Sequence, residues 1–174
     1  NYQIRSADEV AWAVARAFYI AGSGRPGPVV LDFTKDAQVG LTDFRYEKCN
    51  FIRSYVPDPK ISEQALAKAV ALLDGAERPF AVFGQGVILG HAEEELRAFL
   101  EKGDIPAGST LLGLSALPSD FPLYRGMLGM HGNVAPNRMT NACDVLVAVG
   151  MRFDDRVTGT GATYARQAEV IQHD

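Results

Sequence analysis

Val145-Leu-Val-Ala-Val149 is an uninterrupted aliphatic run, and Gly150 follows it directly. A strand that is buried on both faces of a parallel sheet has this pattern, rather than an alternation of apolar and polar residues. Parallel sheets bind their ligands at the carboxyl ends of their strands. The segment after this strand, Met151-Arg-Phe-Asp-Asp-Arg-Val-Thr-Gly159, is therefore a predicted ligand site.

This segment carries two guanidinium groups and two carboxylates within five residues, namely Arg152, Asp154, Asp155 and Arg156. Gly150 allows the chain to turn tightly before them. An anion that carries ribose hydroxyls would suit this set of charges. The alternative is a solvated loop whose charges neutralise one another, and the sequence leaves both interpretations open.

A second glycine-punctuated segment, Gly126-Met-Leu-Gly-Met-His-Gly132, lies nineteen residues before the first. Met130 offers a polarizable surface for a flat ring system, and His131 offers a hydrogen-bond donor at the edge of such a ring. We expect this loop to be too flexible to be held except by neighbours or by a ligand. A solvated histidine is the alternative. No serine, cysteine or second histidine stands at a spacing that would support a nucleophilic triad or a zinc site.

Helical and strand patterns alternate from residue 61 onward, which predicts an α/β fold: a doubly wound parallel sheet with helices on both faces. We expect strands at 80–83, near 105, at 145–149 and at 170–172, and helices at 62–75, about 91–102, after 109 and at about 134–142.

The first part of the chain predicts a separate αβ unit. A capping box, Ser6-Ala-Asp-Glu9, opens a helix near 6–21, and a strand follows at 29–33. Periodicity then disappears from residue 35 to 60, so we expect a linker. The predicted organisation is a first domain at 1–36, a linker at 37–60 and a second domain at 61–174.

Two further turns give weaker signals. Gly84-Gln85-Gly86 follows the strand 80–83, but Leu89 stands where a G-x-G-x-x-G motif has its third glycine, so an ordinary tight turn is the favoured interpretation. Ser109 and Thr110 follow the next strand, and their hydroxyls would face the same edge of the sheet. Ser109 could equally be a simple helix N-cap.

Composition limits the remaining classes. The 174 residues are 47% hydrophobic with a net charge of −4, which fits one well-buried core in a soluble protein. No apolar run approaches the roughly 20 residues of a membrane helix, no leader opens the chain, and Lys and Arg are scattered, so we expect a cytoplasmic protein without membrane or nucleic-acid partners. Cys49 and Cys143 share no metal-ligand spacing.

The motifs GMLGMHG and RFDDRVTG, together with Ser23-Gly-Arg-Pro-Gly-Pro-Val-Val-Leu-Asp32, resemble the large, catalytic subunits of the acetolactate (acetohydroxyacid) synthase family. The resemblance extends over nearly the whole chain. It implies that 61–174 is the central, FAD-binding-type domain of a thiamine-diphosphate-dependent enzyme, with a six-stranded sheet completed beyond this chain. Residues 1–36 would be the C-terminal end of the pyrimidine-binding domain.

The resemblance also implies site residues. The positions that match flavin contacts are Arg25, Gly84, Gln85, Gly86, Thr110, Leu111, Leu112, Met130, His131, Gly150, Met151, Arg152, Asp154, Arg156, Val157 and Asp174. The substrate channel, where herbicides bind, matches Lys35, Met130, Asp155 and Arg156. Thr34 stands where the family has proline, and we expect this change to loosen the turn.

The parent enzyme implied by the resemblance condenses two 2-ketoacids, pyruvate with pyruvate or 2-ketobutyrate, with decarboxylation, in branched-chain amino acid biosynthesis. Thiamine diphosphate and Mg²⁺ would be bound by other domains of the same polypeptide, and FAD would brace this one. We therefore expect the fragment alone to be inactive. Its parent would be a homo-oligomer that can pair with a regulatory small subunit. Two alternatives stay open: an NAD-binding redox domain of the same fold group, and a structural domain with a vestigial, empty pocket.

Overall fold

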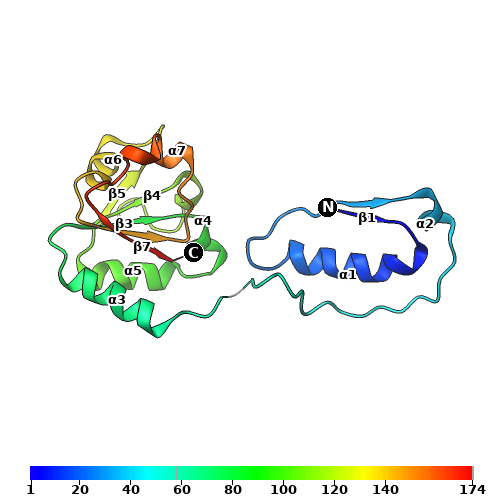
Figure 1. The fold of residues 1–174 in the computed structure, drawn as a ribbon. Coiled ribbons are helices and arrows are strands. Elements are labelled where there is room, and N and C mark those ends of the chain that lie inside the picture. The colour runs from blue at the N-terminus through cyan, green and yellow to red at the C-terminus, as the bar shows by residue number, and fades with distance from the viewer. Residues whose placement is uncertain (58, 174) are drawn as a thin grey trace. The chain divides into compact units, whose positions relative to one another are not determined.

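The computed structural model describes residues 1–57 and 59–173. The chain folds as two compact units, Asn1–Ile61 and Ser62–Asp174 (Figure 1). Asp174, one of the predicted flavin contacts, lies outside the described residues. Every helix in the described part of the chain is too short or too polar to span a bilayer.

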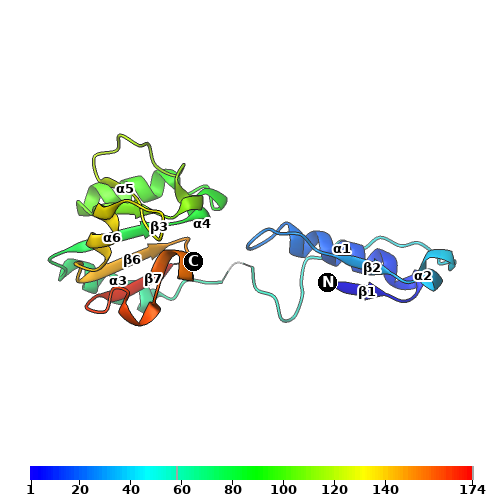
Figure 2. The same ribbon diagram turned by 90° about the horizontal axis from the view of Figure 1, so that it is seen from above.

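The first unit is a small β-α-β arrangement (Figure 2). Its elements are β1 (Tyr2–Ile4), η1 (Ala7–Glu9), α1 (Val10–Ala21), β2 (Leu31–Phe33) and α2 (Lys35–Val39). The strands β1 and β2 are parallel, with Ile4 opposite Phe33. Ile4 and Ala13 are buried together with Ala37, so that α1 and α2 pack against the strand pair.

Two predictions for this unit were wrong in detail. Among the described residues, the Ser6 side chain makes no cap hydrogen bond, and the carboxylate of Glu9 accepts the backbone N–H of Arg5 at 3.1 Å instead of that of Ser6. The predicted capping box is therefore absent, because a 3₁₀ turn precedes the α-helix. The expected linker also contains a helix, α2, which is too short to give a periodic pattern.

The turn at Thr34 is the start of α2. The Thr34 hydroxyl accepts the backbone N–H of Ala37 at 3.4 Å and so caps the N-terminus of α2. Threonine is among the preferred N-cap residues, because its side chain satisfies an N–H that the helix leaves free. Lys35 is the first residue of this helix, and its side chain is exposed.

The second unit is a doubly wound α/β domain, which confirms the predicted fold class. Its parallel sheet has the order β5-β4-β3-β6-β7 in the described chain. The strands are β3 (Pro79–Phe83), β4 (Ala107–Ser109), β5 (Tyr124–Met127), β6 (Val145–Val149) and β7 (Glu169–His173). The helical elements are α3 (Glu63–Asp74), α4 (Gln85–Leu89), α5 (Glu93–Gly103), η2 (Leu111–Gly113), α6 (Val134–Thr140), α7 (Asp155–Thr158) and η3 (Gly161–Thr163).

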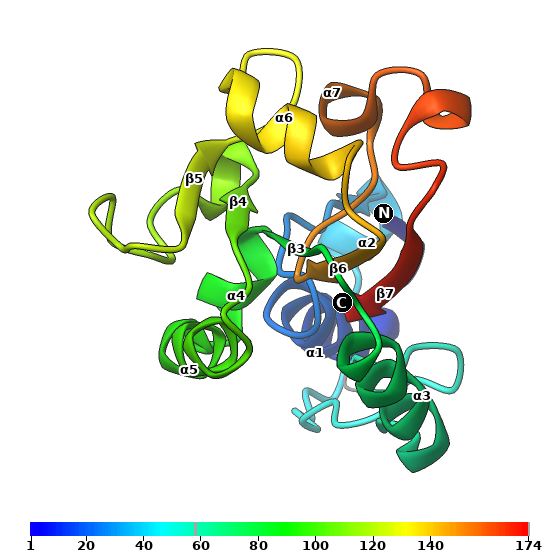
Figure 3. The ribbon, with the colours of Figure 1, turned by 90° about the vertical axis from the view of Figure 1, so that its left-hand side faces the viewer.

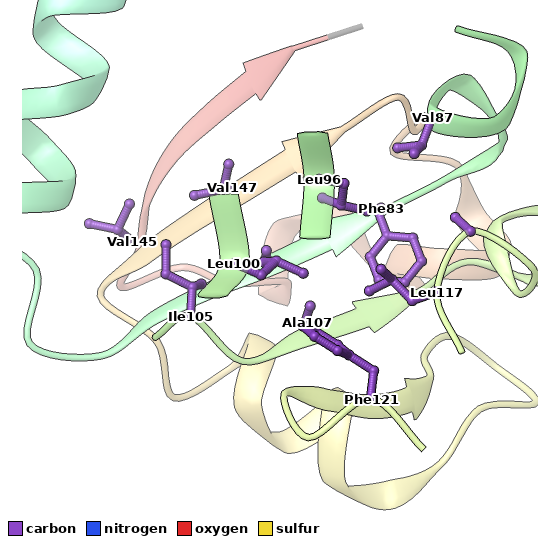
Figure 4. Packing of buried hydrophobic residues seen from close by; sticks show 12 residues of the cluster. Phe83, Val87, Leu96, Leu100, Ile105, Ala107, Leu117, Phe121, Val145 and Val147 are labelled. Carbon is purple, nitrogen blue, oxygen red and sulfur yellow. The ribbon is translucent and has the colours of Figure 1, made fainter. Parts of the chain in front are cut away.

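Helices cover both faces of this sheet (Figure 3). Alternate residues of β6 divide between two core clusters: Val147 packs with Leu96 and Leu100 of α5, whereas Leu146 packs on the opposite face with Cys143. Figure 4 shows the first cluster, in which the side chains of α5 meet those of β3, β4 and β6. Burial on both faces explains why β6 is an uninterrupted aliphatic run.

The strand β5 was missed by the sequence analysis, which placed its end in a flexible loop. Arg125 is exposed, and Gly126 has a φ of +98°, so this edge strand has neither an aliphatic run nor a regular alternation. The helix expected after Ser109 is only the 3₁₀ turn η2, and the strand expected near 105 begins at Ala107. These differences shift element boundaries and leave the topology unchanged.

Candidate cofactor site

The strand order reverses between β3 and β6. From β3 the chain continues through β4 and β5 on one side, and from β6 it continues to β7 on the other. Phe83 and Val149, the last residues of the two strands, are paired in register. Such a switch point is where open α/β sheets hold their ligands, so the turns after β3 and β6 define the candidate site.

The two turns at the switch point are packed directly against each other. The backbone N–H of Gly84 donates to Val149 O at 3.0 Å, and that of Gly86 donates to Gly150 O at 2.8 Å. A Cβ atom at Gly86 would lie 2.5 Å from the Cα of Gly150, and one at Gly150, whose φ is +55°, would lie 2.6 Å from the backbone nitrogen of Val87. The contact between the two turns therefore requires these glycines, whether or not a ligand binds.

The turn after β4 presents apolar side chains. Thr110 donates its backbone N–H to Phe83 O at 2.8 Å, and η2 begins immediately after it. Leu111 is 67% exposed and Leu112 is 58% exposed. Ser109 differs from both suggested roles: it is completely buried, its hydroxyl lies 2.7 Å from that of Tyr124, and Thr110 takes the N-cap position.

The segment 126–132 is held by protein neighbours. Asn133, at the N-cap of α6, accepts the backbone N–H of Met127 at 3.1 Å through its side chain and donates its own N–H to Met127 O at 2.7 Å. Asn137 pairs with both backbone groups of Gly129, at 2.9 and 3.0 Å. Met130 and His131, both exposed, therefore extend from an anchored backbone.

Asn133 and Asn137 are site residues that the sequence analysis missed. A usable signal was present, because asparagine side chains readily bond to nearby backbone and both residues stand at the start of a helix that follows a glycine-rich loop. The sequence pattern of the loop indicated its histidine and methionine, whereas the two asparagines that hold the loop lie at the start of the next helix, α6.

The segment 151–159 contains the four predicted charged residues in two loose pairs. Arg152 and Asp154 lie 3.6 Å apart, and Arg156 and Asp155 lie 4.0 Å apart, with all four side chains at least 40% exposed. Exposed pairs of this kind contribute little stability, so the guanidinium groups stay available to a ligand. Asp154 also caps α7 by accepting the backbone N–H of Arg156 at 3.0 Å.

Met151 and Val157 flank these charges but face the core. Met151 is 3% exposed within the second core cluster, and Val157 packs against that cluster. Their side chains are therefore committed to packing, and a ligand contact at Met151 would use its main chain.

The two loops are joined through Met130 and Arg156. The backbone N–H of Met130 donates to Arg156 O at 2.9 Å, and the guanidinium Nη1 of Arg156 lies 3.8 Å from Met130 Sδ. The helices on either side of this junction, α6 and α7, lie next to each other in Figure 3. The contact between Met130 and Arg156 thus brings the exposed predicted residues of segments 126–132 and 151–159 together.

Several apolar side chains near the carboxyl edge of the sheet are exposed. All of them lie on segments that leave the carboxyl ends of β3, β4, β5 or β6, and each is at least 36% exposed. This apolar rim consists of Leu89, Leu111, Leu112, Leu114, Met130, Val134 and Phe153. Exposed apolar side chains gathered at one functional edge are typical of a ligand or partner surface.

Arg25 and Lys35 belong to the first unit. Arg25 is exposed in a turn anchored by Tyr55, whose hydroxyl donates to Ser23 O at 2.7 Å. Gly24, with a φ of +56°, allows that hydroxyl to approach, since a Cβ there would lie 2.9 Å from it. The backbone of this turn is therefore held by Tyr55.

The strongly shifted ionisable groups belong to the core and not to the predicted site residues. Burial raises the pKa of the Cys143 thiol to about 11 and that of the Tyr164 hydroxyl to about 12. Both side chains pack in or against the second core cluster. Within residues 1–57 and 59–173, no group of three or more His, Cys, Asp or Glu residues could hold a metal ion.

Comparison with known proteins identifies relatives of both units. The family model "Thiamine pyrophosphate enzyme, central domain" matches residues 66–174. Three similar proteins each align with the whole chain. They are the acetolactate synthase large subunit of Corynebacterium glutamicum (39% identical, 28% of the relative covered), the acetolactate synthase isozyme 2 large subunit of Escherichia coli (40%, 31%) and the chloroplastic acetolactate synthase 1 of Zea mays (39%, 27%).

A similar solved structure comes from Mycobacterium smegmatis and is described as a thiamin diphosphate-dependent enzyme. It has a TM-score of 0.74 and 25% sequence identity, over 99% of this chain and 33% of that one. The chain thus spans about a third or less of the length of these relatives.

Proposed function

Since this chain belongs to the thiamine pyrophosphate enzymes and carries their central domain, we propose that it is part of an acetolactate synthase large subunit. The parent enzyme would condense pyruvate with a second 2-ketoacid, with decarboxylation, in branched-chain amino acid biosynthesis. Relatives named acetolactate synthase align with the complete chain at 39–40% identity, which supports this assignment.

The role we propose for this chain is to bind FAD at the carboxyl edge of the second unit and brace it there. The observation that carries the proposal is the junction of Met130 with Arg156, which brings a polarizable side chain and a guanidinium together. The site also has Leu111 and Leu112 exposed on the neighbouring turn.

The residues present fit the chemistry of a flavin nucleotide. A flavin ring has large apolar faces, which Leu111, Leu112 and Met130 can cover. Its pyrophosphate is an anion, which the exposed guanidinium groups of Arg152 and Arg156 can bind. The switch-point glycines offer less support, since the packing of Gly86 on Gly150 explains them without a ligand.

We propose that Lys35, Met130, Asp155 and Arg156 line the channel through which substrate reaches the reaction centre in the parent enzyme. Lys35, Asp155 and Arg156 are charged and exposed. The two cationic side chains, Lys35 and Arg156, can therefore reach the carboxylate of a 2-ketoacid. Thiamine diphosphate supplies the chemistry that stabilises the carbanion formed on decarboxylation. The residues that bind thiamine diphosphate and Mg²⁺ would come from other domains of the polypeptide. The parent enzyme would form its active centre as a homo-oligomer, and a regulatory small subunit would be a further partner.

The proposed binding is tested by titrating FAD into the purified 174-residue chain and following flavin fluorescence and thermal unfolding, with NAD as the parallel ligand. A ligand that binds only the folded state raises its stability, by about 2.7 kcal/mol at a hundredfold excess over its Kd. We expect stabilisation by FAD and none by NAD.

A matched pair of variants locates the site. Arg156→Gln removes a proposed phosphate ligand, whereas Arg166→Gln removes an exposed arginine three residues before β7, toward the opposite edge of the sheet. We expect weaker FAD binding only for Arg156→Gln. Stabilisation by NAD alone would replace this proposal with a redox domain, and binding of neither ligand would favour a structural domain with an empty pocket.

The predicted inactivity of the fragment is a separate proposal. Purified chain supplied with pyruvate, thiamine diphosphate, Mg²⁺ and FAD should form no acetolactate. Turnover by a preparation that contains no full-length enzyme would contradict it.

A further inference from the structure

Asn137 makes an unusual contact with the backbone of the segment 126–132. Its side-chain oxygen accepts the N–H of Gly129 at 2.9 Å, and its side-chain nitrogen donates to Gly129 O at 3.0 Å. Gly129 is buried, so neither backbone group can turn to bulk water if the contact is lost. The amide of Asn137 is suited to this task because it carries a donor and an acceptor side by side.

Gly129 needs such a clamp because its own geometry does not fix it. Its φ is +101°, a region that glycine enters freely and other residues rarely adopt. A Cβ there would lie 2.7 Å from Arg156 O, which excludes larger residues. The conformational freedom that permits this close approach also leaves the peptide unrestrained unless a neighbour holds it.

The next residue along the chain, Met130, carries the contact to the second loop. Its backbone N–H donates to Arg156 O at 2.9 Å. Arg156 is in turn fixed by the carboxylate of Asp154, which accepts its N–H at 3.0 Å. A rotation of the Gly129 peptide would therefore displace Met130 from Arg156 and separate the two loops.

The beginning of the segment is held from the same helix. Asn133 is the N-cap of α6, four residues before Asn137. Its side-chain oxygen accepts the N–H of Met127 at 3.1 Å, and its own backbone N–H donates to Met127 O at 2.7 Å. The start of α6 therefore holds both the strand end and its loop.

We infer that Asn137 is a positioning residue for the ligand surface: by clamping Gly129 it presents Met130 and His131 and keeps Met130 docked on Arg156. Naming flavin as the ligand rests on the proposed function. The clamp itself rests on the hydrogen bonds alone. Asn137 acts through Gly129 and Met130.

Two variants of the whole 174-residue chain test this role, with Arg138→Ala as the matched control on the same helix. Asn137→Ala removes both hydrogen bonds. Asn137→Asp keeps an acceptor for the Gly129 N–H but loses the donor to Gly129 O, and aspartate and asparagine have similar helix propensities. Arg138 is exposed, so its truncation perturbs the helix without touching the clamp.

The first readout needs no ligand. Amide hydrogen exchange of Gly129 and Met130, followed by NMR in ¹⁵N-labelled protein, should accelerate about tenfold or more in Asn137→Ala, with a smaller increase in Asn137→Asp. Arg138→Ala should leave both amides as protected as in the wild type. Equal exchange in Asn137→Ala and Arg138→Ala would overturn the inference.

The second readout is the Kd for FAD, which should rise about tenfold in Asn137→Ala, while Arg138→Ala keeps the wild-type value. Faster exchange with unchanged FAD affinity would show a clamp that does not position the ligand surface, and would also overturn the inference. If the wild-type chain takes up no FAD, the proposed function fails, and exchange at Gly129 and Met130 then decides the clamp alone. Should Asn137→Ala fail to fold, Asn137→Asp provides the same comparison.

Discussion

The backbone N–H of Gly86 donates a 2.8 Å hydrogen bond to the carbonyl oxygen of Gly150, so the turns that leave β3 and β6 are in direct contact. The switch point of the sheet is therefore closed at its base by backbone. Ligand binding has to use the loops that rise around it, above all the junction of Met130 with Arg156.

Gly86→Ala should destabilise the second unit. The new Cβ would lie 2.5 Å from the Cα of Gly150 and 2.9 Å from its oxygen, and neither backbone atom can move without shifting the turn. Overpacking of this kind costs about 1–3 kcal/mol. Urea unfolding followed by circular dichroism measures the loss, because the sole tryptophan, Trp12, lies in the first unit.

Gly161→Ala provides the control for this measurement. Apart from its chain neighbours and its own 3₁₀ turn, no described residue has an atom within 4 Å of a Cβ at Gly161. The free energy of unfolding of Gly161→Ala should therefore stay within about 0.5 kcal/mol of the wild type. Equal losses in the two variants would mean that the contact between the turns is not what requires glycine at Gly86.

Two tyrosine hydroxyls should respond oppositely to removal. Tyr124→Phe breaks the 2.7 Å hydrogen bond to Ser109, which is completely buried, and leaves that serine unsatisfied at a cost of about 1–3 kcal/mol. The hydroxyl of Tyr164 makes no hydrogen bond of normal geometry among the residues that the structure describes, and the Thr140 side chain near it only partly offsets the rise in its pKa caused by burial. Tyr164→Phe should therefore keep or raise the free energy of unfolding.

Urea unfolding of the two variants in parallel makes this comparison, because each substitution removes one tyrosine hydroxyl and nothing else. A similar loss in both would show that Tyr164 has a partner, such as an ordered water, and would contradict the prediction.

The two cysteines should differ in reactivity toward iodoacetamide at neutral pH. Burial raises the pKa of Cys143 to about 11, and the residue is 2% exposed, so it contains very little thiolate and gives the reagent little access. Cys49 is partly exposed. Mass spectrometry should find rapid labelling of Cys49 and slow labelling of Cys143 in the folded chain, and similar rates in urea.

The strands β3 and β6 could be predicted from sequence because both are buried on their two faces, and a strand of this kind consists of a run of apolar residues. The edge strand β5 could not. Arg125 and Gly126 occupy it because, within residues 1–57 and 59–173, one side of the strand has no neighbouring strand, and because its end must turn. Its pairing with β4 depends on residues distant in the chain.

The candidate site was predictable only in part, for a related reason. Charged and amphipathic side chains such as Arg156 and Met130 are visible in a sequence, and the order of strands brings them to one edge. The hydrogen bonds that fix them, from Asn137 to Gly129 and from Met130 to Arg156, join segments whose register is set by packing. The switch-point glycines show the converse: a motif that suggested a ligand is explained by contact between two turns.

The carboxylate of Asp144 should make the stability of the second unit depend on pH. It accepts the backbone N–H of Glu77 at 2.7 Å and that of Arg78 at 3.0 and 3.1 Å, and so fixes the chain where it enters β3. Desolvation, the largest single influence, raises its pKa, but these N–H groups together lower the pKa below its usual value.

The lowered pKa means that the folded state keeps this carboxylate ionised at pH values where the unfolded chain protonates it. Its contribution to stability is therefore complete above the unfolded pKa of about 3.9 and is lost as the pH falls through the lower folded pKa.

Asp144→Asn should unfold at a lower urea concentration than the wild type at pH 7. This difference in the urea midpoint should narrow below about pH 4. Asp120→Asn, an exposed aspartate, is the control and should show no such difference. If the difference in urea midpoint between Asp144→Asn and the wild type stays constant from pH 7 to pH 3, ionisation of the carboxylate does not contribute to the stability of the second unit.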